Sequence, residues 1–207
     1  MCDAASQIGD GKSSAAFHTA VNGEGRTFSV INVVSGPSLP HTEVIGGYNP
    51  VSWNSSGGYT GNPTDVGRTA FLFNLTQGLL QRQNLSSQGQ SQGYSQTLNS
   101  GSYGPTFGGG YDLGVNGNLD SGYVYNFSYG GTTNVTNILG NPNGSNYSNT
   151  LGYNGIEVFT ITSEVAATPE PGTITLFVGM GLSGSVFVKR RRRQGSKEVT
   201  AQGTAGN

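Results

Sequence analysis

Glycine makes up 35 of the 207 residues of this chain, about one in six. Each glycine inside a helix costs about 1 kcal/mol relative to alanine, so long helices and coiled coils are excluded. A collagen helix is excluded as well, because the glycines follow no strict Gly-X-Y period and only 8 residues are proline. Aromatic residues reach 10% and the formal net charge is only −1, which argues against a charged disordered chain. These counts predict one mainly β domain rich in turns.

The charges are divided unevenly along the chain. Residues 1–171 carry four basic and ten acidic groups, a net charge of −6, whereas residues 172–207 carry six basic groups and one acid, a net charge of +5. This division indicates an acidic, solvated body and a basic tail that meets an anionic surface. The body has no stripe of lysine and arginine that could neutralise phosphates, so we expect no nucleic acid among its partners.

An uncharged, mostly apolar run covers residues 172–188. As a helix it is about 26 Å long, close to the roughly 30 Å of a hydrocarbon core. Five cations follow it, and such groups resist translocation and are attracted to anionic lipid. They are Lys189, Arg190, Arg191, Arg192 and Arg193. We expect a transmembrane helix over 172–188, the body outside, and a disordered cytoplasmic tail over 194–207. A buried core strand followed by a solvated basic run is the alternative.

Pro169, Glu170 and Pro171 stand directly before this run. The order Pro-Glu-Pro, apolar run and arginine cluster over residues 169–193 resembles the PEP-CTERM sorting signal of exported bacterial proteins. The resemblance implies an exosortase-type processing enzyme as a partner and a place in the bacterial cell envelope. The body would lie on the outer side of the inner membrane or be exported after processing. A signal peptide is not visible in residues 1–6, and a cytosolic protein with a tail anchor is the alternative.

Short segments of β-branched and aromatic residues, bounded by Gly, Asn, Pro or Ser, predict the strands. They cover residues 27–34, 43–48, 69–75, 122–129 and 155–162. A helix is predicted over residues 13–21, with Ser13 or Ser14 as the N-cap. The Gln- and Ser-rich residues 81–96 predict an exposed low-complexity loop, and residues 163–168 predict a linker.

The body, residues 1–162, resembles the TLDc domain of eukaryotic oxidation-resistance proteins and assorted microbial proteins. The matching segments include Phe17-His18, Ile45-Gly46-Gly47-Tyr48 with Trp53, and residues 70–75, 103–113 and 156–159. The resemblance implies an α+β, mainly β fold, namely a two-sheet antiparallel β-sandwich with a few short helices. The positions that carry the family motif are Phe17, His18, Gly46, Gly47, Tyr48, Trp53, Gly108, Gly109, Gly110, Asp112 and Glu157.

Two glycine runs invite a physical interpretation. We expect Gly46-Gly47 at the end of a strand, where missing side chains let the backbone bend and Tyr48 or Trp53 pack closely. Gly108-Gly109-Gly110 before Asp112 fits either of two interpretations. One is a backbone N–H nest that binds an anion, and the other is a tight corner in which Asp112 bonds to local backbone.

Catalytic and metal-binding patterns are mostly absent from the sequence. A phosphate loop at Gly11-Lys12-Ser13 lacks its upstream glycine, and Cys2, His18 and His41 have no zinc-ligand spacing. An acid–base pair would have to come from the carboxylates of Glu24, Glu43, Asp112 and Glu157. Glu157 alternates with apolar neighbours, so we expect it to be exposed on a strand. The sequence predicts no cofactor, no metal and no catalytic residue.

Two functions of different classes follow. The first is an exported, membrane-anchored or exosortase-processed surface or extracellular-matrix protein whose TLDc-like domain is non-catalytic. Its partner would be a surface polysaccharide or another surface protein. The second is an enzyme or an oxidative-stress-protective protein, which rests on the family resemblance alone.

Overall fold

The structure is a computed structural model that describes residues 6–7, 13–36, 39–88, 91–131, 136–141 and 147–161. The predicted linker, sorting signal (Pro169, Glu170, Pro171, the span 172–188 and the cluster 189–193) and tail lie outside these residues. Within the described ranges, no helix is both long and apolar enough to cross a membrane.

Strands dominate the described part of the chain. In chain order its strands and α-helix are β1 (Ser6–Gln7), α1 (Ser14–Val21), β2 (Thr27–Ser35), β3 (Glu43–Asn49), β4 (Ser56–Gly61), β5 (Phe71–Asn74), β6 (Leu79–Arg82), β7 (Ser95–Ser100), β8 (Leu113–Val115), β9 (Ser121–Val124) and β10 (Tyr147–Thr160). Three short 3₁₀ helices are η1 (Asp65–Gly67), η2 (Ser86–Gln88) and η3 (Ser91–Tyr94).

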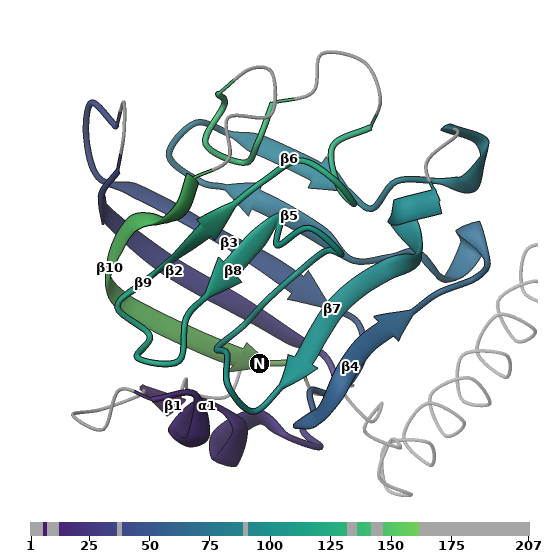
Figure 1. The fold of residues 1–207 in the computed structure, drawn as a ribbon, viewed down its shortest axis with the longest axis horizontal. Coiled ribbons are helices and arrows are strands. Elements are labelled where there is room, and N and C mark those ends of the chain that lie inside the picture. Colours follow the sequence, from purple (N-terminus) through teal and green to yellow (C-terminus); the bar gives the residue numbers. More distant parts are fainter. Residues whose placement is uncertain are drawn as a thin grey trace, which may run out of the picture. The chain divides into compact units, whose positions relative to one another are not determined.

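All pairings between the strands are antiparallel, and one large sheet holds most of them. Its order is β6-β5-β3-β2-β10-β9-β8, and β1 also pairs with β10. Figure 1 shows that this sheet is strongly curled, with β8 and β9 lying in front of β2 and β3. The second sheet contains only β4 and β7. The prediction of a mainly β, antiparallel domain with few helices is therefore confirmed, although its two sheets are very unequal in size.

Burial alternates along β2 as expected for a strand with one face on the core. Ile31 and Val33 are fully buried, while the residues between and before them, Val30 and Asn32, are half-buried. The register pairs Ile31 with Ile45 of β3, so the inner faces of the two strands coincide. Core residues of β8 and β9 belong to the same buried cluster as those of β2 and β3. The curled sheet thus closes around a single core.

α1 begins as the sequence predicts. The hydroxyl of Ser13 accepts a hydrogen bond from the backbone N–H of Ala16 at 3.2 Å, which identifies Ser13 as the N-cap. The ring of Phe17 on this helix is 5.4 Å from that of Trp53, and Trp53 is 5.4 Å from Phe107. The helix therefore contributes to the core through its buried face.

The prediction that Gly46 and Gly47 lie at a strand end is wrong, because both lie inside β3. A Cβ atom on Gly46 would come 2.1 Å from the carbonyl oxygen of Ser29 and 2.4 Å from the ring of Phe73. A Cβ on Gly47 would come 2.6 Å from the ring of Phe107. Because neither position carries a side chain, the rings of Phe73 and Phe107 can pack on the two faces of β3.

The predicted exposed loop over residues 81–96 is wrong at both of its ends, although residues 85–88 are exposed. Gln81 ends up in β6, Gln96 in β7, and Gln83, Asn84 and Gln96 are each 2% exposed or less. The predicted strand 122–129 covers only β9 up to Val124, while β4, β6, β7 and β8 go unpredicted. Polar composition is therefore a poor guide to burial in this segment.

Candidate functional site

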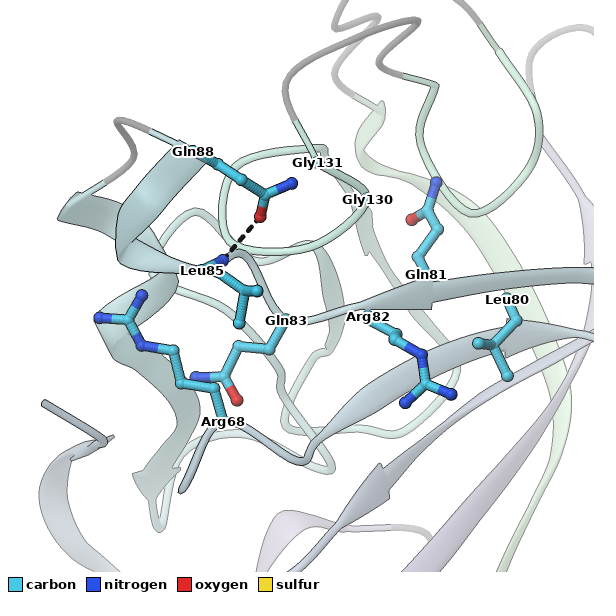
Figure 2. Close-up of a pocket in the computed structure, with 9 residues that line it drawn as sticks. All are labelled: Arg68, Leu80, Gln81, Arg82, Gln83, Leu85, Gln88, Gly130 and Gly131. Carbon is cyan, nitrogen blue, oxygen red and sulfur yellow. Dashed lines mark hydrogen bonds between the residues drawn. The ribbon is translucent and has the colours of Figure 1, made fainter. Parts of the chain in front are cut away.

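A pocket of about 370 Å³ lies beside β6, the strand at one edge of the large sheet. Figure 2 shows its walls, with the guanidinium groups of two arginines on either side of Gln83 in this view. The lining residues are Arg68, Leu80, Gln81, Arg82, Gln83, Leu85, Gln88, Gly130 and Gly131. The chain segments 68, 80–88 and 130–131 therefore meet at one point of the fold.

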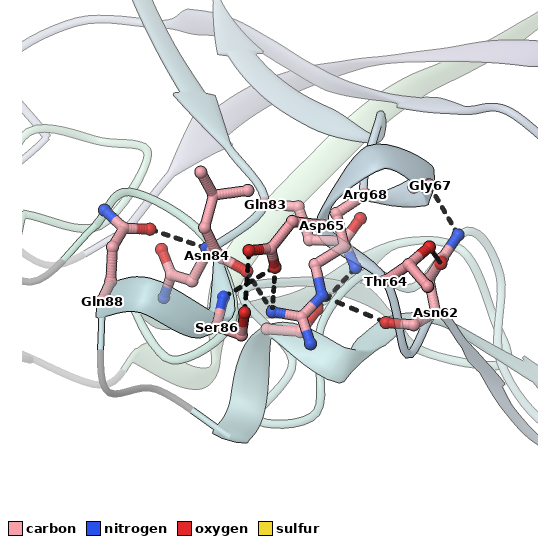
Figure 3. Close-up of polar contacts among 11 residues, drawn as sticks. Asn62, Thr64, Asp65, Gly67, Arg68, Gln83, Asn84, Ser86 and Gln88 are labelled. Atoms are coloured by element: carbon pink, nitrogen blue, oxygen red, sulfur yellow. Dashed lines mark hydrogen bonds and ion pairs between the residues drawn. The ribbon is translucent and has the colours of Figure 1, made fainter.

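Hydrogen bonds fix the position of Arg68. Its Nε donates to the carbonyl oxygen of Asn62 at 3.0 Å, and its Nη1 donates to that of Asn84 at 2.8 Å. Nη1 also lies 3.4 Å from Oδ1 of Asp65, and the Arg68 side chain is only 4% exposed. Figure 3 shows these contacts converging on one guanidinium group. These contacts within the domain thus hold the guanidinium group of Arg68 in a fixed position in the wall of the pocket.

Asp65 lies beside Arg68 and is held in place by hydrogen bonds from Ser86. Its Oδ1 accepts from the backbone N–H of Ser86 and its Oδ2 accepts from the Ser86 hydroxyl, both at 2.7 Å. These two hydrogen bonds from Ser86, together with the positive charge of Arg68, hold the pKa of the Asp65 carboxyl below its usual value. Asp65 therefore stays ionised at neutral pH and links η1 to η2 (Figure 3).

Asn84 connects Arg68 to the loop of Gly130 and Gly131. Its Nδ2 donates to the carbonyl oxygen of Phe127 at 3.1 Å, and its Oδ1 accepts from the N–H of Gly131 at 2.6 Å. The N–H of Gly130 donates to the carbonyl oxygen of Arg82 at 3.0 Å. Gly130 and Gly131 both have positive φ, at 94° and 82°, which a residue with a side chain rarely adopts. The loop can therefore turn tightly against β6.

These bonds make the pocket a preformed site. Gln83 is held in the same way, because its Nε2 donates to the carbonyl oxygen of Gly93 at 2.6 Å. Concave, preformed sites with a few fixed polar groups are typical of small-ligand binding, and 370 Å³ lies near the lower end of their size range. The arrangement is suited to holding a ligand.

The motif residues Phe17, His18 and Trp53 are buried in the domain. Trp53 donates from Nε1 to the Thr27 hydroxyl at 2.8 Å. Both ring nitrogens of His18 face oxygens, with Nδ1 2.8 Å from Oδ1 of Asn22 and Nε2 2.9 Å from the carbonyl oxygen of Ser100. His18 therefore connects the C-terminal end of α1 to the C-terminal end of β7.

Asp112 is fully buried, and its partners are distant in sequence. Its Oδ1 accepts hydrogen bonds from the backbone N–H groups of Phe127, Ser128 and Tyr129, at 2.6, 2.7 and 3.0 Å. The second oxygen, Oδ2, has no hydrogen-bond partner among the described residues. Burial raises the pKa of Asp112 to about 6, and the three N–H bonds oppose this rise.

The glycine run before Asp112 forms a tight turn, in which the N–H of Tyr111 donates to the carbonyl oxygen of Gly108 at 3.3 Å, but Asp112 bonds to distant rather than local backbone. The N–H of Gly108 donates to the carbonyl oxygen of Gln96 at 2.9 Å, and that of Gly109 donates to the Ser128 hydroxyl at 2.8 Å. These two groups are therefore used inside the domain, and Gly110 has no room for a Cβ beside the Tyr125 ring. The N–H nest lies instead at residues 127–129, and the anion in it is Asp112 itself.

The remaining motif and carboxylate residues do not form one site. Tyr48 is half-buried, with its ring 5.0 Å from Phe28 and 5.1 Å from Phe71. Glu157 is exposed on β10, as predicted. Glu43 is buried at the start of β3, where its Oε1 accepts from Nε2 of Gln77 at 2.6 Å. No group of three or more His, Cys, Asp or Glu that could hold a metal occurs in the described ranges.

Sequence reasoning misses the pocket entirely. Its lining residues match no motif, and the segment that supplies most of them was predicted to be a loop. One signal was present in the sequence. Arg68 and Arg82 are two of only four basic residues before position 172 and are separated by 14 positions. A pair of cations so close together in an acidic body is the pattern in the sequence that distinguishes this segment.

Comparison with models of known protein families matches residues 6–162 to the TLDc domain. This match covers most of the chain and all of the described elements. No curated protein matches the chain.

Proposed function

This chain belongs to the TLDc domain family, and we propose that its domain is a non-catalytic binding module displayed on the surface of a bacterial cell. In this proposal residues 169–193 act as a PEP-CTERM sorting signal. The span 172–188 holds the protein in the membrane, and an exosortase-type enzyme processes it near Pro169, Glu170 and Pro171. The partner of the domain is a surface polysaccharide or another surface protein.

The pocket beside β6 is the observation that supports binding. Its walls are held by hydrogen bonds within the domain, from Arg68 to Asn62 and Asn84 and from Gly131 to Asn84. A site whose side chains are already fixed loses little conformational entropy when a ligand enters, which favours binding. The lining consists of amides, guanidinium groups, leucines and glycines, groups that orient and hold a ligand.

The test compares two leucine variants in the full chain. Leu80 lines the pocket and is 54% exposed, whereas Leu75 lies outside it and is 64% exposed. Leu80→Trp should obstruct the pocket and weaken binding of extracellular polysaccharide extracted from the source cells by ten-fold or more. Leu75→Trp should change it by less than two-fold. Neither substitution changes the charge.

The readout is co-sedimentation of the chain with the extracted polymer. If the wild-type chain does not bind the polymer, a surface polysaccharide is excluded as the partner. If both variants bind alike, the pocket is not the binding site. Cleavage of the polymer by the wild-type chain, detected as new reducing ends, would favour the enzyme alternative instead.

A further inference from the structure

Positive charge is scarce in this domain and gathers at one place. Residues 1–171 have a net charge of −6. Within the described ranges the only lysine or arginine residues are Arg26, Arg68 and Arg82. Two of these three line the pocket. The pocket is therefore the place on an acidic domain where an anionic group would be attracted.

We propose that this pocket binds the carboxylate of a uronic acid residue in an acidic polysaccharide. The proposal rests on the proposed function, and it names the ligand class of the same site.

Arg82 is the residue that would contact the carboxylate. It is exposed on β6, so its guanidinium group is open to a ligand, and its planar fork can bond to both oxygens of a carboxylate. Arg68 is almost fully covered and uses Nε and Nη1 for bonds to Asn62, Asn84 and Asp65. Arg68 therefore contributes mainly its fixed charge.

Gln88 supplies a neutral donor in another part of the lining. Its Oε1 accepts from the backbone N–H of Leu85 at 2.7 Å, which fixes the orientation of the amide (Figure 2). The Nε2 group, with two N–H donors, is then directed away from Leu85. Such a donor suits a hydroxyl oxygen of a sugar ring.

Asp65 is the acidic residue that offsets part of the positive charge of the two arginines. Its carboxylate is ionised and lies 3.4 Å from Nη1 of Arg68, so it offsets one of the two arginines. The Ser86 bonds hold it on the far side of Arg68, and Asp65 does not line the pocket. The charge of Arg82 therefore stays without an offsetting acid in the lining.

The shape and the apolar residues favour a sugar acid over an acidic protein. Stable protein interfaces bury about 800 Å² on each partner, far more than a concave site of this size offers. A volume of about 370 Å³ suits one or two sugar rings. Leu80 and Leu85, 54% and 39% exposed, give the C–H face of a ring an apolar surface to pack on. A uronic acid residue has both such a face and a carboxylate.

The experiment measures binding of the full chain to three defined polymers at low salt. Alginate consists of uronic acids, dextran is a neutral sugar polymer, and poly-glutamate has carboxylates but no sugar ring. We expect alginate to bind at least ten-fold more tightly than either of the others. Arg82→Gln should weaken alginate binding about ten-fold, and Arg82→Lys less. Arg26→Gln, with the same loss of charge outside the pocket, should change it by less than two-fold.

Each contrary result has a distinct meaning. Equal binding of dextran and alginate overturns the carboxylate assignment, and equal binding of poly-glutamate overturns the sugar assignment. Equal effects of Arg82→Gln and Arg26→Gln show attraction by net charge alone and also overturn the inference. If any of these occurs while Leu80→Trp still blocks the extracted polymer, the proposed function stands and only the ligand class is wrong.

Discussion

The Asp112 carboxylate is buried in a way that opposes folding at neutral pH. Oδ1 receives three backbone N–H bonds, but Oδ2 is enclosed without a partner among the described residues. Burial disfavours the ionised form and raises the pKa to about 6, from 3.8 for an exposed aspartate. Between these two pH values the unfolded chain loses its proton while the folded domain keeps it.

This difference sets the sign of a pH effect on stability. The contribution of Asp112 to stability is complete below about pH 3.8 and is lost as the pH rises through about 6. The shift of roughly two pKa units corresponds to about 3 kcal/mol. Asp112→Asn keeps an oxygen for the three N–H groups and cannot ionise. We therefore expect the unfolding free energy of the variant, relative to wild type, to rise by about 3 kcal/mol between pH 3 and pH 7.

Urea unfolding of both proteins across this pH range measures the effect. Taking the difference between them removes the contributions of the other titrating groups. Asp120→Asn, at an exposed aspartate, is the matched control and should show no such trend. A difference between wild type and Asp112→Asn that stays constant with pH would contradict the assignment of this pKa.

At the scale of elements, the segment from β6 to β7 shows what composition cannot reveal. Its glutamines and asparagines look like a solvated loop, yet their amides bond to backbone groups far away in sequence. Gln81 donates to the carbonyl of Thr136, and Asn84 bonds to Phe127 and Gly131. Such bonds lower the cost of burying an amide, and the partners are set by the tertiary fold.

A substitution at Asn84 tests whether this segment contributes to the stability of the folded domain. Asn84→Ala leaves the N–H of Gly131 without its acceptor and the carbonyl of Phe127 without its donor, which should cost about 1–3 kcal/mol of unfolding free energy. The same substitution at Asn118, which is exposed, should cost less than about 0.5 kcal/mol. Chemical denaturation measures both. Equal losses for the two variants would mean that residues 83–88 are not part of the cooperative core.

Other elements were predictable because their signals are local. The serine cap marks the start of α1, and runs of β-branched residues mark β2 and the C-terminal part of β10. The predictions for β2 and β3 each fall one residue short of the observed C-terminal end. β4 and β7 have polar and glycine-rich sequences, Ser56–Gly61 and Ser95–Ser100, so neither propensity nor alternation distinguishes them from loops.

For the whole molecule, the motif residues prove to organise the core while the pocket lies elsewhere. Trp53, Gly46 and Gly47 serve packing, and Asp112 fixes the loop of residues 127–129. The pocket arises only when residues 68, 80–88 and 130–131 meet at the sheet edge. Sequence patterns describe local periodicity, whereas the residues of this site are spread over more than 60 positions of the chain. The only sign of the site in the sequence is therefore its pair of arginines, Arg68 and Arg82, in a segment of the chain with few basic residues.

The last prediction concerns how the chain is held in the cell. An uncharged run over residues 172–188 followed by Lys189 and four arginines should insert into lipid, because apolar side chains favour the hydrocarbon core and the cations stay at the cytoplasmic surface. We expect the full chain to sediment with membranes and to resist a carbonate wash. A variant without residues 172–188 should be released, and one with residues 189–193 changed to Gln should stay bound but in mixed orientations, measured by protease protection. Release of the wild-type chain by carbonate would remove the basis for membrane display, whereas binding at the pocket beside β6 would still stand on its own test.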